Sequence, residues 1–544
     1  MNKNIYTYCH NWFAENIVGL FTEIKISYLP PLMIYMAAGI SGLTSIVGTF
    51  YVKERLGLSA EFLAALGFWA GLPWALKMPV GHLIDLIWKW KGLLVYLGAS
   101  LIGGSLVIMI LLLGNPNEMS LIATPGSWFV FATLLAPIGY VLQDVVADAM
   151  TVEAVPRVDS NGRQISSSDR KSMHTTMQTL GRVAIIGGGI LVSVINVIVL
   201  QGVGDLSDDG KSDAYLFVYQ IALLIPLVSV FGVVLASALK KRETNQLLKK
   251  GYTKSQAEKL LGSKGSNRPE INWWILGGGL GFAIISVTIG LADVGLGQEL
   301  IFILSMFIVV FLISKIIKEL DRDSQSILIG TAILIFVFRA MPTPGAGSTW
   351  WMIDVLHFDQ QFLAKLSLIA SVLALFGMFV FRRFMAERSI TYVIGFLTVA
   401  GTILSIPIIG MYFGLHIWTA EMTNGVVDAR FIAMIDTALE SPLGQVAMIP
   451  MLAWIANSAP ENLKATFFAI MASFANLALS ASQLGTKYLN QFFTISREVK
   501  EDGVVTMAAN YSDLGWLLIS VSSIGFLLPM ATILYLKYSR FQNA

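Results

Sequence analysis

Charged side chains are scarce in this sequence. Asp, Glu, Lys and Arg make up only 13% of its 544 residues, whereas hydrophobic residues make up 55%. An average soluble domain carries about 25% charged residues. This composition excludes an ordinary soluble protein, and a formal net charge of +2 gives no support for a nucleic-acid partner. We therefore expect an integral membrane protein.

Cysteine and histidine are also rare. The single cysteine, Cys9, excludes an internal disulfide and any metal site built from several cysteines. The five histidines are scattered along the chain, so we expect no bound metal and no cofactor. Residues 1–27 lack a basic start, a long apolar core and a small-residue cleavage site. From this we predict that no signal peptide is cleaved.

Long apolar runs dominate what is present. A helix that crosses a bilayer needs about 20 apolar residues, and only helices or closed barrels satisfy the backbone in lipid. Runs of this length predict an all-α polytopic membrane protein of about 14 spans. The spans are expected near residues 28–52, 60–83, 91–114, 127–150, 172–200, 214–239, 273–293, 299–318, 326–345, 361–381, 389–413, 430–456, 465–490 and 514–536.

The spans fall into two groups of six. The predicted order is a cytoplasmic N-terminal segment (1–27), an N-terminal six-helix half (28–239), a basic cytoplasmic linker (240–271), an inserted helix pair (272–320) and a C-terminal six-helix half (321–544). Similar Pro- and Gly-containing segments, 137–141 and 442–446, lie in the fourth span of each half. Two related halves with binding between them are typical of secondary transporters.

Positive charge sets the predicted orientation, because lysine and arginine prefer cytoplasmic loops. Most of the 37 lysines and arginines are cytoplasmic if the N-terminus lies inside. We therefore predict a multi-pass protein of a plasma or bacterial inner membrane, with both termini cytoplasmic. The basic linker is expected to lie against anionic lipid.

A charged motif follows the second span. Gly81, Asp85 and Lys89 recur at four-residue spacing where the apolar run ends. An apolar helix followed by Gly-x-x-x-Asp and a cation resembles the cytoplasmic loop between helices 2 and 3 of the major facilitator superfamily. The resemblance implies that the Asp caps its helix, pairs with charges on neighbouring helices and helps to hold one gate state.

Five stretches together resemble the folate–biopterin transporter family of that superfamily. They lie within residues 42–59, 72–81, 144–153, 342–363 and 459–476. They follow the family's order and touch both halves. The resemblance implies a major facilitator fold and a transporter of a polar organic metabolite, such as a folate, a pterin or S-adenosylmethionine. We expect alternating access, proton symport and a monomer, with the small-molecule substrate, protons and the lipid bilayer as its partners.

Two acids share one face of the fourth span. Asp144 and Asp148 are four residues apart, and Arg182 in the fifth span reaches a similar depth. A charge at the bilayer centre costs about 2.5–3.5 kcal/mol, so it is retained where it is paired or useful. The acids could relay protons or orient substrate, with Arg182 as their partner.

The alternative is an inner-gate network of salt bridges around the same acids. Its members would be Asp144, Asp148, Lys77, Asp85, Glu153 and Arg157, together with Gly81 and Lys89 of the motif. The sequence leaves both interpretations open.

A second pair of acids lies in the second half. Asp436 and Glu440 are four residues apart, and Arg339 precedes Pro342 at comparable depth. Arginine can hold a carboxylate in a bidentate grip. Either Arg339 pairs with one of these acids, or it holds the carboxylate of an anionic substrate.

Trp350 and Trp351 follow a run of prolines and glycines. Aromatic residues at this depth usually anchor a helix at the membrane interface. The alternative is a stacking surface for a flat ring such as a pterin.

Enzymatic motifs are missing. Residues 204–212 resemble a phosphate-binding loop, but five residues instead of four separate the glycines. No G-x-S-x-G or H-E-x-x-H motif stands out, so we expect no enzyme. A transporter-fold protein that acts as a sensor or assembly factor stays open as an alternative.

Overall fold

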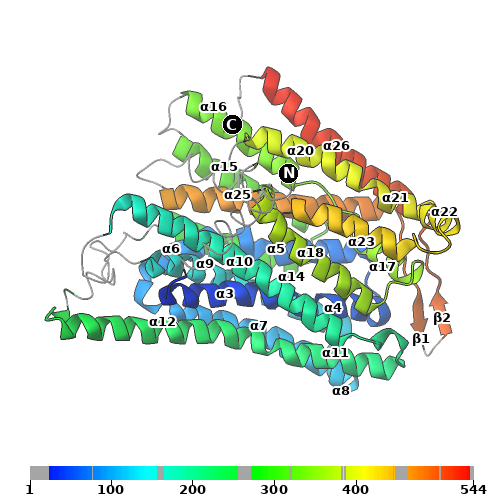
Figure 1. The fold of residues 1–544 in the computed structure, drawn as a ribbon, viewed down its shortest axis with the longest axis horizontal. Coiled ribbons are helices and arrows are strands. Elements are labelled where there is room, and N and C mark those ends of the chain that lie inside the picture. Colours follow the sequence, from blue (N-terminus) through cyan, green and yellow to red (C-terminus); the bar gives the residue numbers. More distant parts are fainter. Residues whose placement is uncertain are drawn as a thin grey trace, which may run out of the picture.

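The computed structural model is a bundle of helices with a small hairpin at one end (Figure 1). It describes residues 24–75, 77–155, 165–254, 256, 271, 273–292, 294–317, 322–381, 384, 388–444, 446, 464–501 and 504–539. Two short antiparallel strands, β1 (Val499–Glu501) and β2 (Val504–Met507), form the hairpin. We call the end that carries it the hairpin end. The opposite end, where α12 ends at Lys249, is the linker end.

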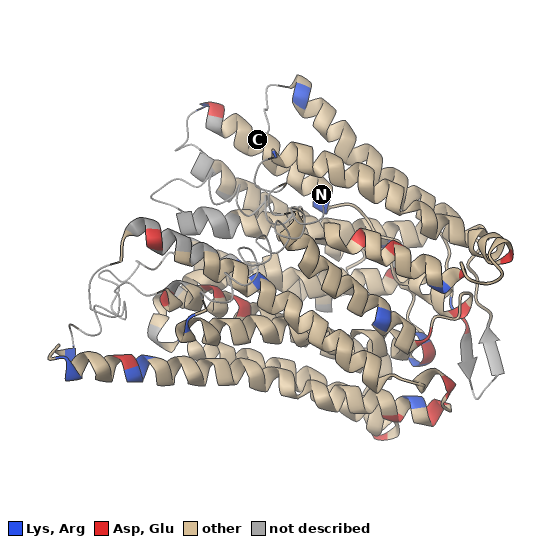
Figure 2. Cartoon of the chain, viewed as in Figure 1, with Lys and Arg blue, Asp and Glu red and all other residues tan. Residues whose placement is uncertain are grey.

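Charged residues gather towards the two ends, and the middle of the bundle is largely uncharged (Figure 2). This is the distribution expected where lipid surrounds the middle of the helices. Among the described residues, nine helices are long and apolar enough to cross a membrane, and three shorter apolar helices lie at residues 275–290, 297–311 and 325–339. An all-α polytopic membrane protein is therefore confirmed, while the count of fourteen spans stays a prediction.

The first group of helices occupies residues 29–249. It consists of α3 (Leu29–Ile40), α4 (Ser45–Tyr51), α5 (Ala60–Ala75), α6 (Lys77–Leu86), α7 (Gly92–Gly114), α8 (Pro116–Ser120), α9 (Pro125–Ala154), α10 (Ser167–Val199), α11 (Asp208–Ala222) and α12 (Leu224–Lys249). Glycine allows two pairs of helices in this group, α7 with α9 and α3 with α10, to approach closely. A Cβ on Gly139 of α9 would lie 2.6 Å from the Gly98 oxygen of α7, and one on Gly188 of α10 would lie 2.7 Å from the Met36 oxygen of α3. Small residues permit such contacts between membrane helices.

The second group follows the linker. It consists of α14 (Trp273–Leu291), α15 (Gly297–Ile317), α16 (Arg322–Arg339), α17 (Ala346–Asp354), α18 (Gln360–Val380), α20 (Ile390–Leu404), α21 (Ile406–Tyr412), α22 (Leu415–Met422), α23 (Ala429–Glu440), α25 (Lys464–Phe492) and α26 (Leu514–Tyr538). The span predicted at 326–345 is shorter than expected, because α16 ends at Arg339. Pro342 and Pro344 cannot donate backbone hydrogen bonds, so the chain leaves the helix there and resumes it in α17.

The two groups meet along two seams. Helix α5 packs on α25, and α10 packs on α18. Within the second group, the pair α14 and α15 lies against α25 and also contacts α5 and α6 of the first group. Gln298 donates to the Ala65 oxygen at 3.2 Å, and Glu299 pairs with Lys487 at 2.9 Å. The predicted inserted pair therefore bridges one seam in this structure.

Candidate functional site

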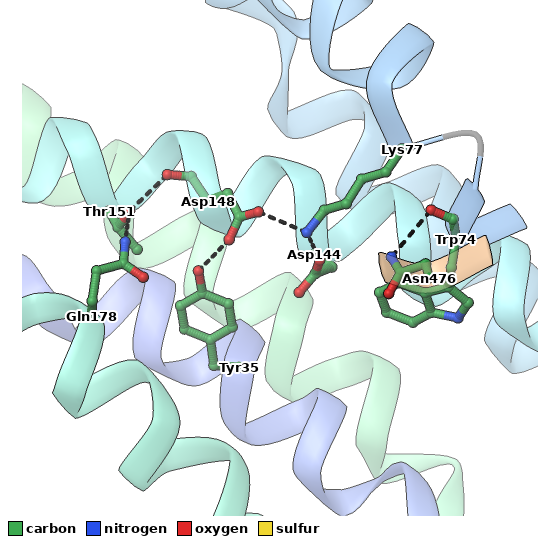
Figure 3. Close-up of polar contacts among 8 residues, drawn as sticks. All are labelled: Tyr35, Trp74, Lys77, Asp144, Asp148, Thr151, Gln178 and Asn476. Atoms are coloured by element: carbon green, nitrogen blue, oxygen red, sulfur yellow. Dashed lines mark hydrogen bonds and ion pairs between the residues drawn. The ribbon is translucent and has the colours of Figure 1, made fainter. Parts of the chain in front are cut away.

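A cluster of charged groups joins α6, α9 and α3 inside the bundle (Figure 3). Asp144 and Asp148 lie one turn apart on α9, and both face Lys77 at the start of α6. The Lys77 ammonium is 2.5 Å from Asp144 Oδ2 and 2.8 Å from Asp148 Oδ2. Tyr35 of α3 donates its hydroxyl hydrogen to Asp148 Oδ1 at 2.6 Å. One ammonium therefore holds two carboxylates in place.

The same cluster is linked to its surroundings on both sides (Figure 3). Thr151 donates to the Asp148 carbonyl oxygen at 2.7 Å, and Gln178 of α10 donates to the Thr151 hydroxyl at 3.3 Å. Asn476 of α25 donates to the Trp74 carbonyl oxygen at 3.4 Å, just before α6 begins. The second group of helices thus contacts the chain next to the cluster.

Arg182 does not take the place expected for it. The sequence suggested Arg182 as the partner of the acids, whereas in the structure the cation that contacts both carboxylates is Lys77. Arg182 is half-buried on α10 and acts electrostatically on Asp144 and Tyr35 from nearby. It therefore supplies the cluster with a second positive charge.

Glu153 belongs to a different set of contacts at the linker end. Its carboxylate lies 2.7 Å from Lys91 Nζ and 3.9 Å from Lys240 Nζ, so it joins α9 to the start of α7 and to α12. The described members of the predicted inner-gate network therefore form two separate sets of ion pairs. One set is centred on Lys77 and the other on Glu153. Gly81 approaches Val145 of α9. Arg157 and the side chains of Asp85 and Lys89 lie outside the described part of the chain.

Arg339 is the last residue of α16 and lies half-buried. Its Nε donates to the Ala475 carbonyl oxygen of α25 at 3.1 Å. Within the described residues it forms no ion pair with Asp436 or Glu440. Those acids act on each other on α23, and Asp436 Oδ1 is buried without a hydrogen-bond partner among the described atoms. Of the two alternatives for Arg339, the structural pair with Asp436 or Glu440 is therefore not formed between the described residues.

The break after Arg339 is held by one face of α25. Three side chains of α25 reach it: Ser482 donates to the Met341 oxygen at 2.6 Å, Thr486 accepts from the Thr343 nitrogen at 2.9 Å, and Asn490 donates to the Pro344 oxygen at 3.2 Å. Gly345 has a φ of +75°, a conformation that glycine adopts at low cost. The backbone around Arg339 is thereby fixed.

Trp350 and Trp351 lie inside the protein. Their exposed fractions are 1% and 3%, so the prediction that they anchor a helix at the lipid interface is wrong. The Arg497 guanidinium lies over the Trp350 ring at 5.8 Å, and Trp351 packs against Tyr412. A stacking role for either ring towards a ligand stays a prediction.

The hairpin end is closed by contacts between the two groups of helices. Lys53, after α4, pairs with Asp354 at the end of α17, and Tyr511 donates to the same carboxylate. Arg497, which is only 4% exposed, donates to the Val52 oxygen at 2.8 Å. We call Lys53, Asp354, Arg497 and Tyr511 the hairpin-end closure. Sequence reasoning missed these residues because each lies at or beyond the end of an apolar run.

Further contacts continue along the seam from the same end. Gln360 donates to the Tyr215 hydroxyl at 2.7 Å, and the hydroxyls of Ser193 on α10 and Ser367 on α18 lie 2.9 Å apart. Each contact joins a residue of the first group to one of the second. Among the described residues, one ion pair and several hydrogen bonds therefore close the seam at the hairpin end.

Comparisons with known proteins agree with this architecture. The model of the BT1 family matches residues 38–542. The folate-biopterin transporter of Synechocystis sp. is 22% identical over 453 residues, covering 82% of this chain and 71% of that protein. A POT family transporter in complex with 5-aminolevulinic acid has a TM-score of 0.62 at 12% identity, covering 94% of this chain and 95% of its own. The nucleoside transporter NupG has a TM-score of 0.52 at 10% identity, with 94% and 99% covered.

The solved structures show that the fold is shared, and the match to the family model shows which family the chain belongs to. It extends over nearly the whole described chain and includes both seams, Lys77 and the hairpin-end closure. The resemblance seen in the sequence is confirmed, and this chain belongs to the BT1 family, a family of membrane transporters.

Proposed function

We propose that the chain is a secondary active transporter of a polar organic metabolite, folate-like or pterin-like, that works by alternating access. Family membership and the name of the Synechocystis relative support the cargo class. The proposed architecture is fourteen helices: two six-helix halves (28–239 and 321–544), an inserted pair (272–320) and a basic linker (240–271). In the predicted orientation the hairpin end faces outward and the linker end faces the cytoplasm.

The observation that carries alternating access is the hairpin-end closure. Lys53 belongs to the first half, whereas Asp354, Arg497 and Tyr511 belong to the second. A molecule could enter from the hairpin end only if these contacts separate. The contacts are polar, so water can replace each of them when the halves move apart.

Charge balance supports proton coupling at the Lys77 cluster. Two cations, Lys77 and Arg182, face two carboxylates, Asp144 and Asp148. If one carboxylate takes up a proton, Lys77 keeps the other as its partner, and the net charge of these four groups rises from zero to +1. The cluster could therefore change its net charge without leaving the ammonium unpaired.

Uptake into proteoliposomes tests the proposal. The full chain is reconstituted, and uptake of labelled folate, biopterin and S-adenosylmethionine is measured with pH gradients of both directions and with none. Gradient-dependent uptake of one compound is the expected result. Absence of uptake of all three by protein that elutes as a single folded species would favour the sensor or assembly role.

Coupling is tested by single Asp144→Asn and Asp148→Asn variants. Each is expected to retain folding, because asparagine keeps the shape of the side chain, but to lose gradient-driven accumulation. Gradient-driven uptake that is unchanged in both variants would remove the cluster from the coupling mechanism.

A further inference from the structure

Arg339 is a charged side chain to which the described residues bring no carboxylate. Its Nε donates to the Ala475 carbonyl, and the charge that acts on it from nearby is a second cation, Arg182. A guanidinium carries five N–H donors, so the group keeps unused capacity for an anion. Ionisable groups at membrane depth are retained where they are paired or functional. The missing counter-charge therefore points to a ligand.

The surroundings of Arg339 favour binding. It ends α16 directly before residues 340–345, and this segment is held by Ser482, Thr486 and Asn490 of α25. Arg339 itself is fastened through one nitrogen of its side chain. A side chain on a fixed support loses little freedom when it binds a partner. The two terminal nitrogens of the Arg339 guanidinium are thus held in position by a backbone that α25 fixes.

The Lys77 cluster does not supply the missing charge. Asp144 and Asp148 are balanced by Lys77 and Arg182. Arg339 adds one further cation from the other group of helices. A carboxylate placed beside Arg339 would balance the sum and would also lie within the influence of Arg182.

We propose that Arg339 binds a carboxylate of the transported molecule, with Arg182 acting on the same anion from the other half. This inference rests on the proposed function and narrows its substrate class. Folate carries two carboxylates on its glutamate part, whereas biopterin carries none. The site selects the anionic, folate-like pteridine over the neutral one, because a bidentate grip on a carboxylate has no equivalent partner in biopterin.

Equilibrium binding to the purified full chain tests the selection without requiring transport. The probes are folate, its dimethyl ester and biopterin, and the readout is quenching of tryptophan fluorescence. Folate and its ester differ in charge while sharing the ring system. The wild-type chain is expected to bind folate about tenfold or more tightly than the ester, as a charge-assisted pair implies. Equal affinity for the two, or no folate binding, overturns the inference.

Variants assign the preference to Arg339. Arg339→Gln is expected to bring the affinities for folate and ester together, and Arg339→Lys to keep part of the preference. Arg388→Gln is the matched control, because Arg388 is exposed at the linker end and contacts the Tyr392 ring. A preference that persists in Arg339→Gln overturns the assignment. If this variant fails to fold, Arg339→Lys decides the assignment, because lysine cannot form a bidentate grip and a preference as strong as that of the wild type would overturn it.

The inference and the proposed function can fail separately. Charge-dependent folate binding without uptake would support the site and refute transport. Uptake of biopterin together with equal binding of folate and its ester would support transport and refute the site.

Discussion

Removing one partner of the hairpin-end closure is expected to open that end of the bundle. Asp354→Asn leaves Lys53 without its carboxylate, although both side chains are largely buried, at 10% and 19% exposed. Breaking a buried pair by removing one partner costs about 3–5 kcal/mol. An open state, in which Lys53 can hydrate, does not carry this cost. If the substitution destabilises only the closed state, by about 3 kcal/mol, the ratio of closed to open molecules falls about a hundredfold.

A cysteine placed in the seam reports the opening. Ser193 is 1% exposed and faces Ser367, and serine and cysteine are similar in shape. In a Cys9→Ser background, Ser193→Cys is reacted with a membrane-impermeant maleimide, and the labelling rate is measured. Addition of Asp354→Asn is expected to raise this rate about ten- to a hundredfold, depending on how often the closed state already opens.

Two controls separate opening from general loosening. Arg430→Gln removes an exposed ion pair with Asp359 at the same end, within the second group of helices, and should leave the rate unchanged. The exchange of charges, Lys53→Asp with Asp354→Lys, should restore slow labelling. The reasoning is refuted if Asp354→Asn reacts at the wild-type rate or if Arg430→Gln accelerates the reaction equally.

Three further predictions concern stability, each measured as the thermal unfolding midpoint in detergent. Lys77→Met removes the ammonium that holds two carboxylates and should cost about 3–5 kcal/mol, whereas Lys77→Arg should recover much of it. Gly139→Val should cost about 1–3 kcal/mol, because even its Cβ would lie 2.6 Å from a carbonyl oxygen of α7, whereas Gly103→Ala, with open space beside it, should cost nothing measurable. Glu299→Gln should cost roughly 2 kcal/mol through the weakened contact with Lys487, and an unchanged midpoint would show that this bridge does not stabilise the seam.

The class of the protein could be predicted from the sequence because lipid imposes a strong constraint on composition. Apolar length and scarcity of charge were sufficient to predict the helical membrane bundle. The end of α16 was also readable in principle, since Pro342 and Pro344 interrupt backbone hydrogen bonding. The predicted span ran past them because the hydropathy of the segment outweighed the two prolines.

Pairing between helices could not be read in the same way. The spacing of Asp144 and Asp148 showed that they share a face, but the rotation of α9 and the position of α6 decide which cation they meet. Lys77 and Arg182 were both at suitable depth. The hairpin-end closure was harder to predict from the sequence. Arg497 contacts Val52, which is 445 residues away in the chain, and no periodic pattern surrounds Arg497.

Helix α25 connects the features on which the proposed function depends. Its Asn476 contacts the chain beside Lys77, and its Ala475 oxygen holds Arg339. Further along, Lys487 pairs with Glu299 of α15, and the chain beyond the helix carries Arg497 into the hairpin-end closure. A displacement of α25 would therefore change the support of Arg339 and the closure together.

This arrangement makes the coupling between binding and gating testable. Asn490→Ala should loosen the support of Arg339 by removing the contact with the Pro344 oxygen, while leaving every member of the hairpin-end closure in place. If α25 transmits the state of one site to the other, folate should slow the maleimide reaction of Ser193→Cys in the otherwise wild-type chain, and this slowing should be weaker with Asn490→Ala. Equal slowing in both would mean that the cargo site and the closure communicate by a route other than α25.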